Sequence, residues 1–166
     1  MKYTVAVLVE NKPGVLTHIS GLISRRAFNI ESIAASYTED EDMTRITIDV
    51  TAEDELQLEQ VINQLSKLIE VIKIVNLTHI DAIERELALI KVKASKLNRS
   101  ELANIVDIFR AKIVDINRET VVIELTGEER KINAFCEVLI DFGIIEIVRT
   151  GKIALGRGPL AAKEMG

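Results

Sequence analysis

An internal repeat constrains this chain of 166 residues more than any other feature, because both halves must then fold into units of one kind. Apolar side chains in each half alternate over short runs, as in strands, and recur at helical spacing between them. The first half predicts a strand at 2–10, a helix from residue 15, strands at 29–38 and 44–51, a second helix and a strand at 71–77.

The second half repeats this order. It predicts strands at 87–94, 112–117, 120–126 and 144–150, with a helix after the first and another after the third. Thr51–Asp54 and Thr126–Glu129 resemble capping boxes at the second helix of each half. The predicted fold is therefore α+β: two tandem ferredoxin-like βαββαβ units, each an antiparallel sheet with its helices on one face. We place the domains at 1–78 and 79–166.

Composition excludes several classes of function. The formal net charge is −5, and no Lys/Arg-dense stripe offers a surface for phosphates, which argues against nucleic acid as a partner. No uninterrupted apolar run approaches the roughly 18 residues of a membrane span. The single cysteine, Cys136, cannot form an internal disulfide, so a cytoplasmic location is expected.

The residues that most often carry catalysis are sparse. His18 and His79 are far apart in the chain and have no spaced Cys or carboxylate ligands beside them, so no metal site is expected. Cys136 lies in the apolar stripe of a helix, where an inert thiol is more common than a nucleophile. The acidic turn Glu39–Asp42 is too short for a calcium loop. We predict no catalytic residue and favour a binding module.

One turn stands out as a ligand site. In Asn11-Lys12-Pro13-Gly14-Val15-Leu16 a strand ends and a helix begins. Pro13 suits a first helical turn, Gly14 lets a ligand approach the backbone, and a helix start offers unpaired N–H groups to a carboxylate. An ordinary strand-to-helix turn is the alternative.

Asn29 and Ile30 place an amide beside an apolar side chain at the start of the second strand. The second half has neither feature, since Lys96–Arg99 replaces the turn and Lys112–Val114 replaces the strand start. Only the first unit is therefore predicted to bind a ligand.

The run VLVENKPGVLTHISGLISRRAFNIESI resembles the N-terminal ACT domain of the small regulatory subunits of acetolactate synthase, also called acetohydroxyacid synthase. ERELALIKVKA at the start of the second repeat and GKIALGRG near the end extend the resemblance over residues 1–158. NKPGVL alone is a general ACT-like signal, and the longer combination is specific.

The resemblance implies a non-catalytic subunit that activates a large catalytic subunit and confers feedback inhibition, usually by valine, in branched-chain amino-acid biosynthesis. The catalytic subunit of that family uses thiamine diphosphate, Mg²⁺ and FAD, and none of these is expected on this chain. An ACT-type amino-acid sensor of another enzyme and a ferredoxin-like RNA-binding protein are the alternatives. An RNA-binding protein of this fold needs aromatic residues on its central strands to stack on bases, whereas the central strands of this chain carry mainly Val, Ile and Thr.

The resemblance also implies a homodimer through the ACT domain, with effector sites between two copies. Residues Asn11 to Leu16 of one copy would form one wall, and Asn29 and Ile30 of the other copy would form the second. With this resemblance in view, we expect the second repeat and tail, with Arg149, Lys152 and Arg157, to help dimerise the chain or to contact the catalytic subunit.

Overall fold

The computed structural model describes residues 1–25 and 28–165. Arg26 and Ala27, which belong to the run that carries the resemblance, lie outside the described residues. The elements are β1 (Lys2–Glu10), α1 (Val15–Arg25), β2 (Asn29–Tyr37), β3 (Met43–Thr51), α2 (Glu55–Leu65), β4 (Val71–Asn76), β5 (Ala82–Lys93), α3 (Arg99–Ile108), β6 (Lys112–Ile116), β7 (Thr120–Gly127), α4 (Glu129–Leu139), a 3₁₀ turn (Ile140–Phe142), β8 (Ile144–Arg149) and β9 (Ile153–Gly156).

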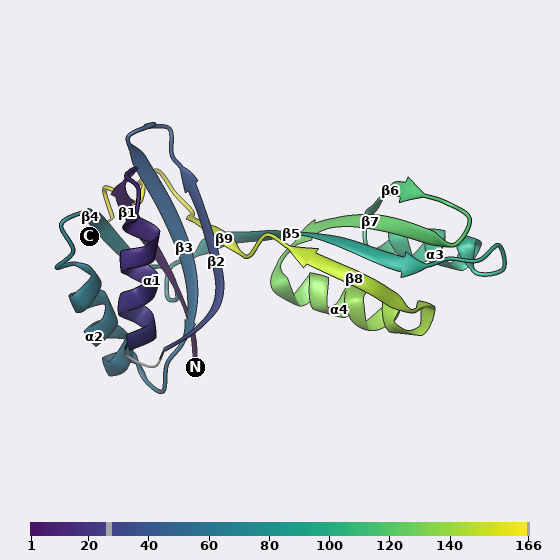
Figure 1. The fold of residues 1–166 in the computed structure, drawn as a ribbon, viewed down its shortest axis with the longest axis horizontal. Helices are drawn as coiled ribbons and strands as arrows, with labels where there is room; N and C mark the ends of the chain where they lie inside the picture. The colour runs from purple at the N-terminus through teal and green to yellow at the C-terminus, as the bar shows by residue number, and fades with distance from the viewer. Residues whose placement is uncertain (26–27, 166) are drawn as a thin grey trace. The chain divides into compact units, whose positions relative to one another are not determined.

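The first sheet has the strand order β2-β3-β1-β4, with each neighbouring pair antiparallel. Helices α1 and α2 lie side by side against one face (Figure 1). The alternation predicted from the sequence explains this arrangement, because Val5, Val7 and Val9 of β1 face the helices and join one apolar core with Ile19 and Leu58. Strand β2 is an edge strand.

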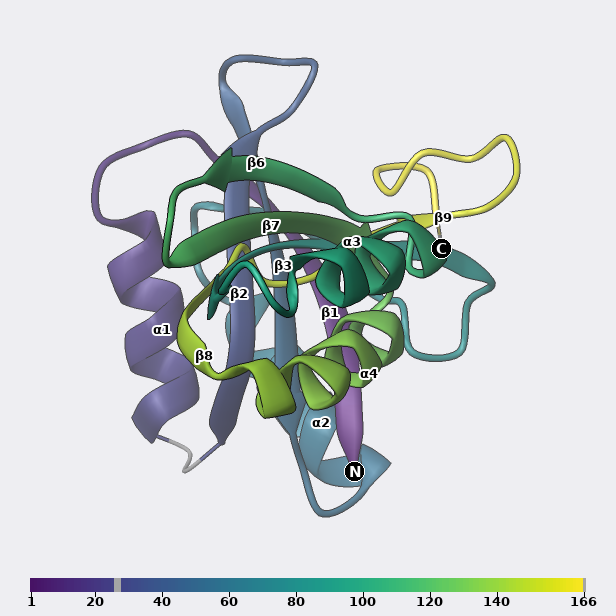
Figure 2. The same ribbon diagram turned by 90° about the vertical axis from the view of Figure 1, so that its right-hand side faces the viewer.

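The second sheet has the order β6-β7-β5-β8, again antiparallel, and α3 and α4 cover one face (Figure 2). Its core contains Ile90 of β5, Ile123 of β7 and Phe135 of α4. Phe135 packs against Phe109 with ring centroids 4.9 Å apart. Both βαββαβ units, with antiparallel sheets and helices on one face, are confirmed.

The helix caps differ from the prediction. Asp54, not Thr51, caps α2: its side chain accepts a hydrogen bond from the amide of Gln57 at 2.8 Å, and Gln57 Oε1 accepts from the amide of Glu53 at 2.8 Å. Thr51 remains in β3. At α4 the cap residue is Glu128, which makes no side-chain capping bond. The expected capping box at 126–129 is therefore absent.

The chain divides into two compact units, residues 1–83 with 152–166, and residues 84–151. The C-terminal segment, which the sequence placed in the second domain, thus packs with the first unit. Ala154 and Ala162 of this segment lie against Ala6, Leu8 and Val75 on the face of the first sheet that the helices leave open. We call residues 152–165 the C-terminal strap.

Candidate functional site

The turn between β1 and α1 lies where the sequence predicts it, but Pro13 is not in the first helical turn, because the helix begins at Val15, after Gly14. Gly14 adopts φ +85°, a conformation that residues with a Cβ rarely take. Its carbonyl oxygen accepts the first helical hydrogen bond, from the amide of His18 at 3.0 Å. The amides of residues 15–17 therefore belong to the unpaired start of the helix. A Cβ built on Gly14 would meet no heavy atom within 4 Å, so the chain leaves this corner open.

Asn11 holds the turn against the β2–β3 hairpin. Its backbone amide donates to the carbonyl oxygen of Asp42, and its side-chain amide donates to that of Glu41, both at 2.8 Å. Thr44 Oγ1 donates to Asn11 Oδ1 at 3.1 Å. Asn11 is therefore a structural anchor of the turn, with its amide group already engaged. Sequence reasoning did not identify the hairpin residues, because they meet Asn11 only in the folded sheet.

Each of two carboxylates near this turn has a basic side chain beside it. Lys12 Nζ lies 2.5 Å from Glu10 Oε2, and hydrogen bonding to Glu10, together with its charge, raises the pKa of Lys12. His18 Nδ1 lies 3.2 Å from Glu70 Oε1. A hydrogen bond from its own backbone amide lowers the pKa of Glu70, and His18 and Lys12 lower it further. Because basic side chains lie beside them, the nearby carboxylates repel an anion at the helix start less strongly than isolated carboxylates would.

Two apolar residues begin the helix in different environments. Val15 is buried in the first core and fixes the helix start, whereas Leu16 is 46% exposed beside Gly14. Pro13 is also exposed. The structure therefore brings Asn11 to Leu16 together as one surface turn that offers backbone donors and an apolar side chain.

Asn29 and Ile30 lie at the other end of the same sheet. Asn29 pairs with Thr51, which pairs with Lys2, whereas the turn follows Glu10 at the far end of β1. The two ends are eight residue steps apart along β1, a distance of about 27 Å at the rise per residue of an antiparallel strand. Asn29 is exposed, and its side chain donates to Glu31 Oε1 over a long 3.3 Å. Within one chain, the two predicted walls do not meet.

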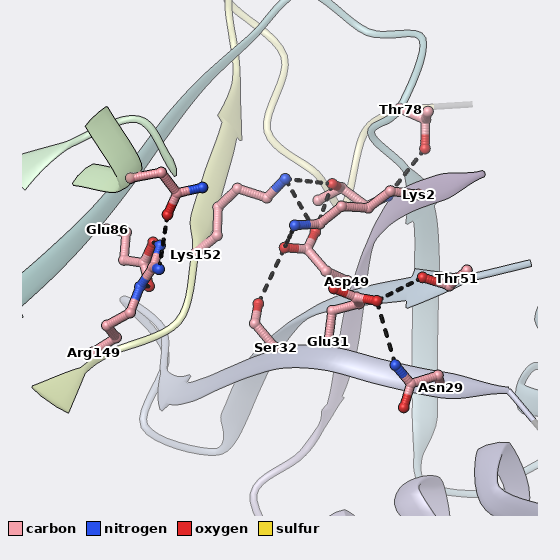
Figure 3. A network of polar contacts seen from close by, with 12 residues as sticks. Lys2, Asn29, Glu31, Ser32, Asp49, Thr51, Thr78, Glu86, Arg149 and Lys152 are labelled. Carbon is pink, nitrogen blue, oxygen red and sulfur yellow. Dashed lines mark hydrogen bonds and ion pairs between the residues drawn. The ribbon is translucent and has the colours of Figure 1, made fainter. Parts of the chain in front are cut away.

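The open face of the first sheet carries a buried polar cluster that sequence reasoning missed (Figure 3). Asp49 of β3 is 1% exposed, and Lys152 of the strap extends its ammonium group to within 3.1 Å of Asp49 Oδ1. Lys152 also donates to Thr4 Oγ1 at 2.8 Å. Asp49 accepts further hydrogen bonds from Thr4 at 2.7 Å and Ser32 at 3.1 Å.

The three basic residues expected to contact another chain are engaged within this one. Lys152 is buried against Asp49, so it is unavailable to a partner. Arg149 forms a two-pronged pair with Glu86, at 2.8 and 2.6 Å, and Arg157 Nε lies 3.1 Å from Asp81. Asp49 stands with Arg45 and Thr47 in the polar half of the alternation of β3, so the sequence carries no signal that Asp49 is buried.

The remaining chemical candidates make only simple contacts. His79 lies 3.1 Å from Glu55 on the surface, and Glu39 of the acidic turn pairs with Lys163 of the strap at 3.4 Å. Burial raises the pKa of the Cys136 thiol, which disfavours the reactive thiolate. Within residues 1–25 and 28–165, no three His, Cys, Asp or Glu side chains are grouped so as to hold a metal ion. No helix among the described residues is long and apolar enough to cross a membrane.

Comparison with known proteins gives consistent matches along the chain. Residues 5–73 match the family model described as AHAS small subunit-like ACT domain, and residues 85–158 match that of the small subunit of acetolactate synthase. A probable acetolactate synthase small subunit of Archaeoglobus fulgidus is 51% identical over 158 residues, 95% of this chain and 98% of that protein. The Bacillus subtilis small subunit is 44% identical, covering 95% and 92%.

A solved structure agrees with the sequence matches. The crystal structure of the acetolactate synthase small subunit from Thermotoga maritima superposes with a TM-score of 0.87 at 39% identity. The match covers 96% of this chain and 99% of that one.

Proposed function

Because the chain belongs to the family of acetolactate synthase small subunits, we propose that it binds the catalytic subunit of that enzyme, raises its activity and makes it sensitive to inhibition by valine. The proposal places thiamine diphosphate, Mg²⁺ and FAD on the catalytic subunit. This chain contributes the effector site and no reacting group.

The observation that carries the proposal is the open helix start at Gly14. A free amino acid carries a carboxylate, and the amides of residues 15–17 offer it hydrogen-bond donors at the positive end of a helix dipole. The exposed side chain of Leu16 offers an apolar surface to an isopropyl group. A hydrophobic amino acid such as valine therefore suits the turn better than a polar one.

The strand order supports a site shared by two copies. Strands β1 and β2 both run antiparallel to β3, so the turn after β1 lies at the same end of the sheet as Tyr37, the last residue of β2. An antiparallel pairing of two β2 edges sets the Asn29 end of one copy beside the Tyr37 end of the other. That arrangement brings together the two walls that one chain keeps apart.

At such a site Asn29 supplies an amide that is only weakly held. Its 3.3 Å bond to Glu31 is long, so a ligand can replace it at low cost. The Glu31 carboxylate then lies close enough to attract an ammonium group. Because the ligand touches both copies, ligand binding and dimerisation strengthen each other by linkage.

Reconstitution with the catalytic subunit from the same organism tests the proposal. We expect the chain to raise the rate of acetolactate formation, and valine to lower the rate of the complex but not of the catalytic subunit alone. Thermal-shift measurements with valine, leucine and isoleucine rank the effectors. A chain that leaves the catalytic rate unchanged, with and without valine, contradicts the proposal and favours a sensor of another enzyme.

A further inference from the structure

Strand β6 forms an exposed apolar edge of the second sheet. It is the terminal strand in the order β6-β7-β5-β8, and all five of its residues are exposed. Ile113, Val114 and Ile116 are 39%, 53% and 56% exposed, and Ile108 at the end of α3 is also exposed. An edge strand of this composition presents unpaired backbone groups and apolar side chains to a further strand.

A bulge in β6 places its two charged residues on one face of the sheet. Lys112 pairs with Glu124 and Asp115 pairs with Val122, with the register shift between Ile113 and Asp115. Residues opposed in an antiparallel pair share a face, and Glu124 and Val122 lie two residues apart on β7. Without the bulge, Lys112 and Asp115 would point to opposite faces.

Neither charge of β6 is neutralised within the described part of the chain. The ion pairs and hydrogen bonds among residues 1–25 and 28–165 do not include the side chain of Lys112 or that of Asp115. Lysines on an edge and bulges commonly keep strands apart. Here the two opposite charges lie on one face of the sheet, one on each side of the strand centre. The strand is therefore complementary in charge to a second β6 strand that runs antiparallel to it.

We propose that β6 pairs antiparallel with β6 of a second copy of this chain, in the register that sets Lys112 opposite Asp115 of the partner subunit. Two-fold symmetry makes this contact twice. The same register sets Ile113 opposite Val114 of the partner subunit, so these two exposed apolar residues of each strand cover those of the other. Opposite charges and apolar pairs across neighbouring strands both stabilise a sheet.

This inference does not rest on the proposed function, because β6 belongs to the unit that lacks the effector turn. Its test uses the full-length chain and amide hydrogen exchange of the peptide covering 112–116. The variants are Lys112→Glu and Asp115→Lys, both at exposed positions. Each sets like charges opposite one another twice, and we expect exchange in β6 to become roughly tenfold faster while exchange in β5 and β7 stays unchanged.

An equimolar mixture of the two variants is the matched control. In a mixed pair, Glu at position 112 faces Lys at position 115, and the native Lys112 and Asp115 face each other. We therefore expect the mixture to recover the slow exchange of the wild type. Wild-type exchange as fast as that of the variants, or a mixture that does not recover, overturns the proposal. Protection that appears only after the catalytic subunit is added also overturns it, since the occupant is then another protein.

Discussion

At the scale of single residues, the effector turn depends most on Gly14. We expect Gly14→Asp to weaken the response of the reconstituted enzyme to valine at least tenfold, because the new carboxylate occupies the helix-start amides and repels that of the ligand. Activation without valine should persist, since space beside Gly14 is open and Asp tolerates a positive φ better than most residues. Rate measurements at graded valine concentrations give the result.

Gly14→Asn is the control, because the asparagine side chain has almost the same shape as that of aspartate but carries no charge. It should keep a larger part of the valine response than Gly14→Asp. Undiminished inhibition of the Gly14→Asp complex would place the effector elsewhere.

The local part of this site was predictable, and its long-range part was not. The backbone preferences of Pro13 and Gly14 indicate a strand-to-helix turn, so the turn could be located from the sequence. The anchoring of Asn11 by Glu41 and Thr44 depends on how a hairpin thirty residues later folds back. Spacing along the chain carries no signal for such a contact.

At the scale of the elements, the C-terminal strap makes one buried ion pair, between Lys152 and Asp49, in addition to its apolar contacts with the first sheet. We expect Lys152→Met to lower the free energy of unfolding of the first unit by about 3 kcal/mol, because Asp49 keeps its charge in a buried position without its closest cation. Denaturant unfolding of the full chain, followed by a probe in the first unit, measures the change.

The exposed pair of Lys163 with Glu39 on the same strap is the matched control. Lys163→Met should cost less than about 1 kcal/mol, since surface ion pairs contribute little. Adding Asp49→Asn to Lys152→Met should recover part of the loss. Equal stability of Lys152→Met and wild type would contradict the role given to the buried pair.

The strand in the C-terminal strap is the element that the sequence did not predict. The strands and helices of both repeats follow apolar periodicity, and their predicted positions lie close to the observed ones, except that β5 begins at Ala82 and not at residue 87. Residues 151–159 contain three glycines and a proline with little periodicity, so no pattern assigned them to a sheet. The first capping box was misplaced because Thr51 hydrogen-bonds to Glu31 across the sheet, which leaves the cap to Asp54.

At the scale of the whole molecule, the two repeats have the same strand order but different surfaces. Within the described residues, only the first has the glycine turn at its helix start, and only the second has an exposed apolar edge strand with two opposite charges on one face. One sequence pattern therefore specifies the architecture twice, while a few residues at loop and edge positions distinguish the two repeats. The separation of the two proposed effector walls within one chain does not follow from periodicity, because it depends on strand order.

The central claim is that one effector site is built from two chains, and subunit complementation tests it directly. Asn29→His blocks the wall opposite to the one that Gly14→Asp blocks, so each variant alone should leave the enzyme insensitive to valine. When the two variants are co-expressed, a mixed dimer contains one site with both walls native, and random pairing restores about a quarter of the sites.

The measurement is the fraction of acetolactate synthesis that valine suppresses in the complex formed with co-expressed variants, at a valine concentration that saturates the wild-type complex but leaves each single variant uninhibited. The account predicts partial return of inhibition, with the affinity for valine of the wild type. If the co-expressed variants stay as insensitive as each variant alone, although mixed dimers are present, the walls belong to one chain or to different sites.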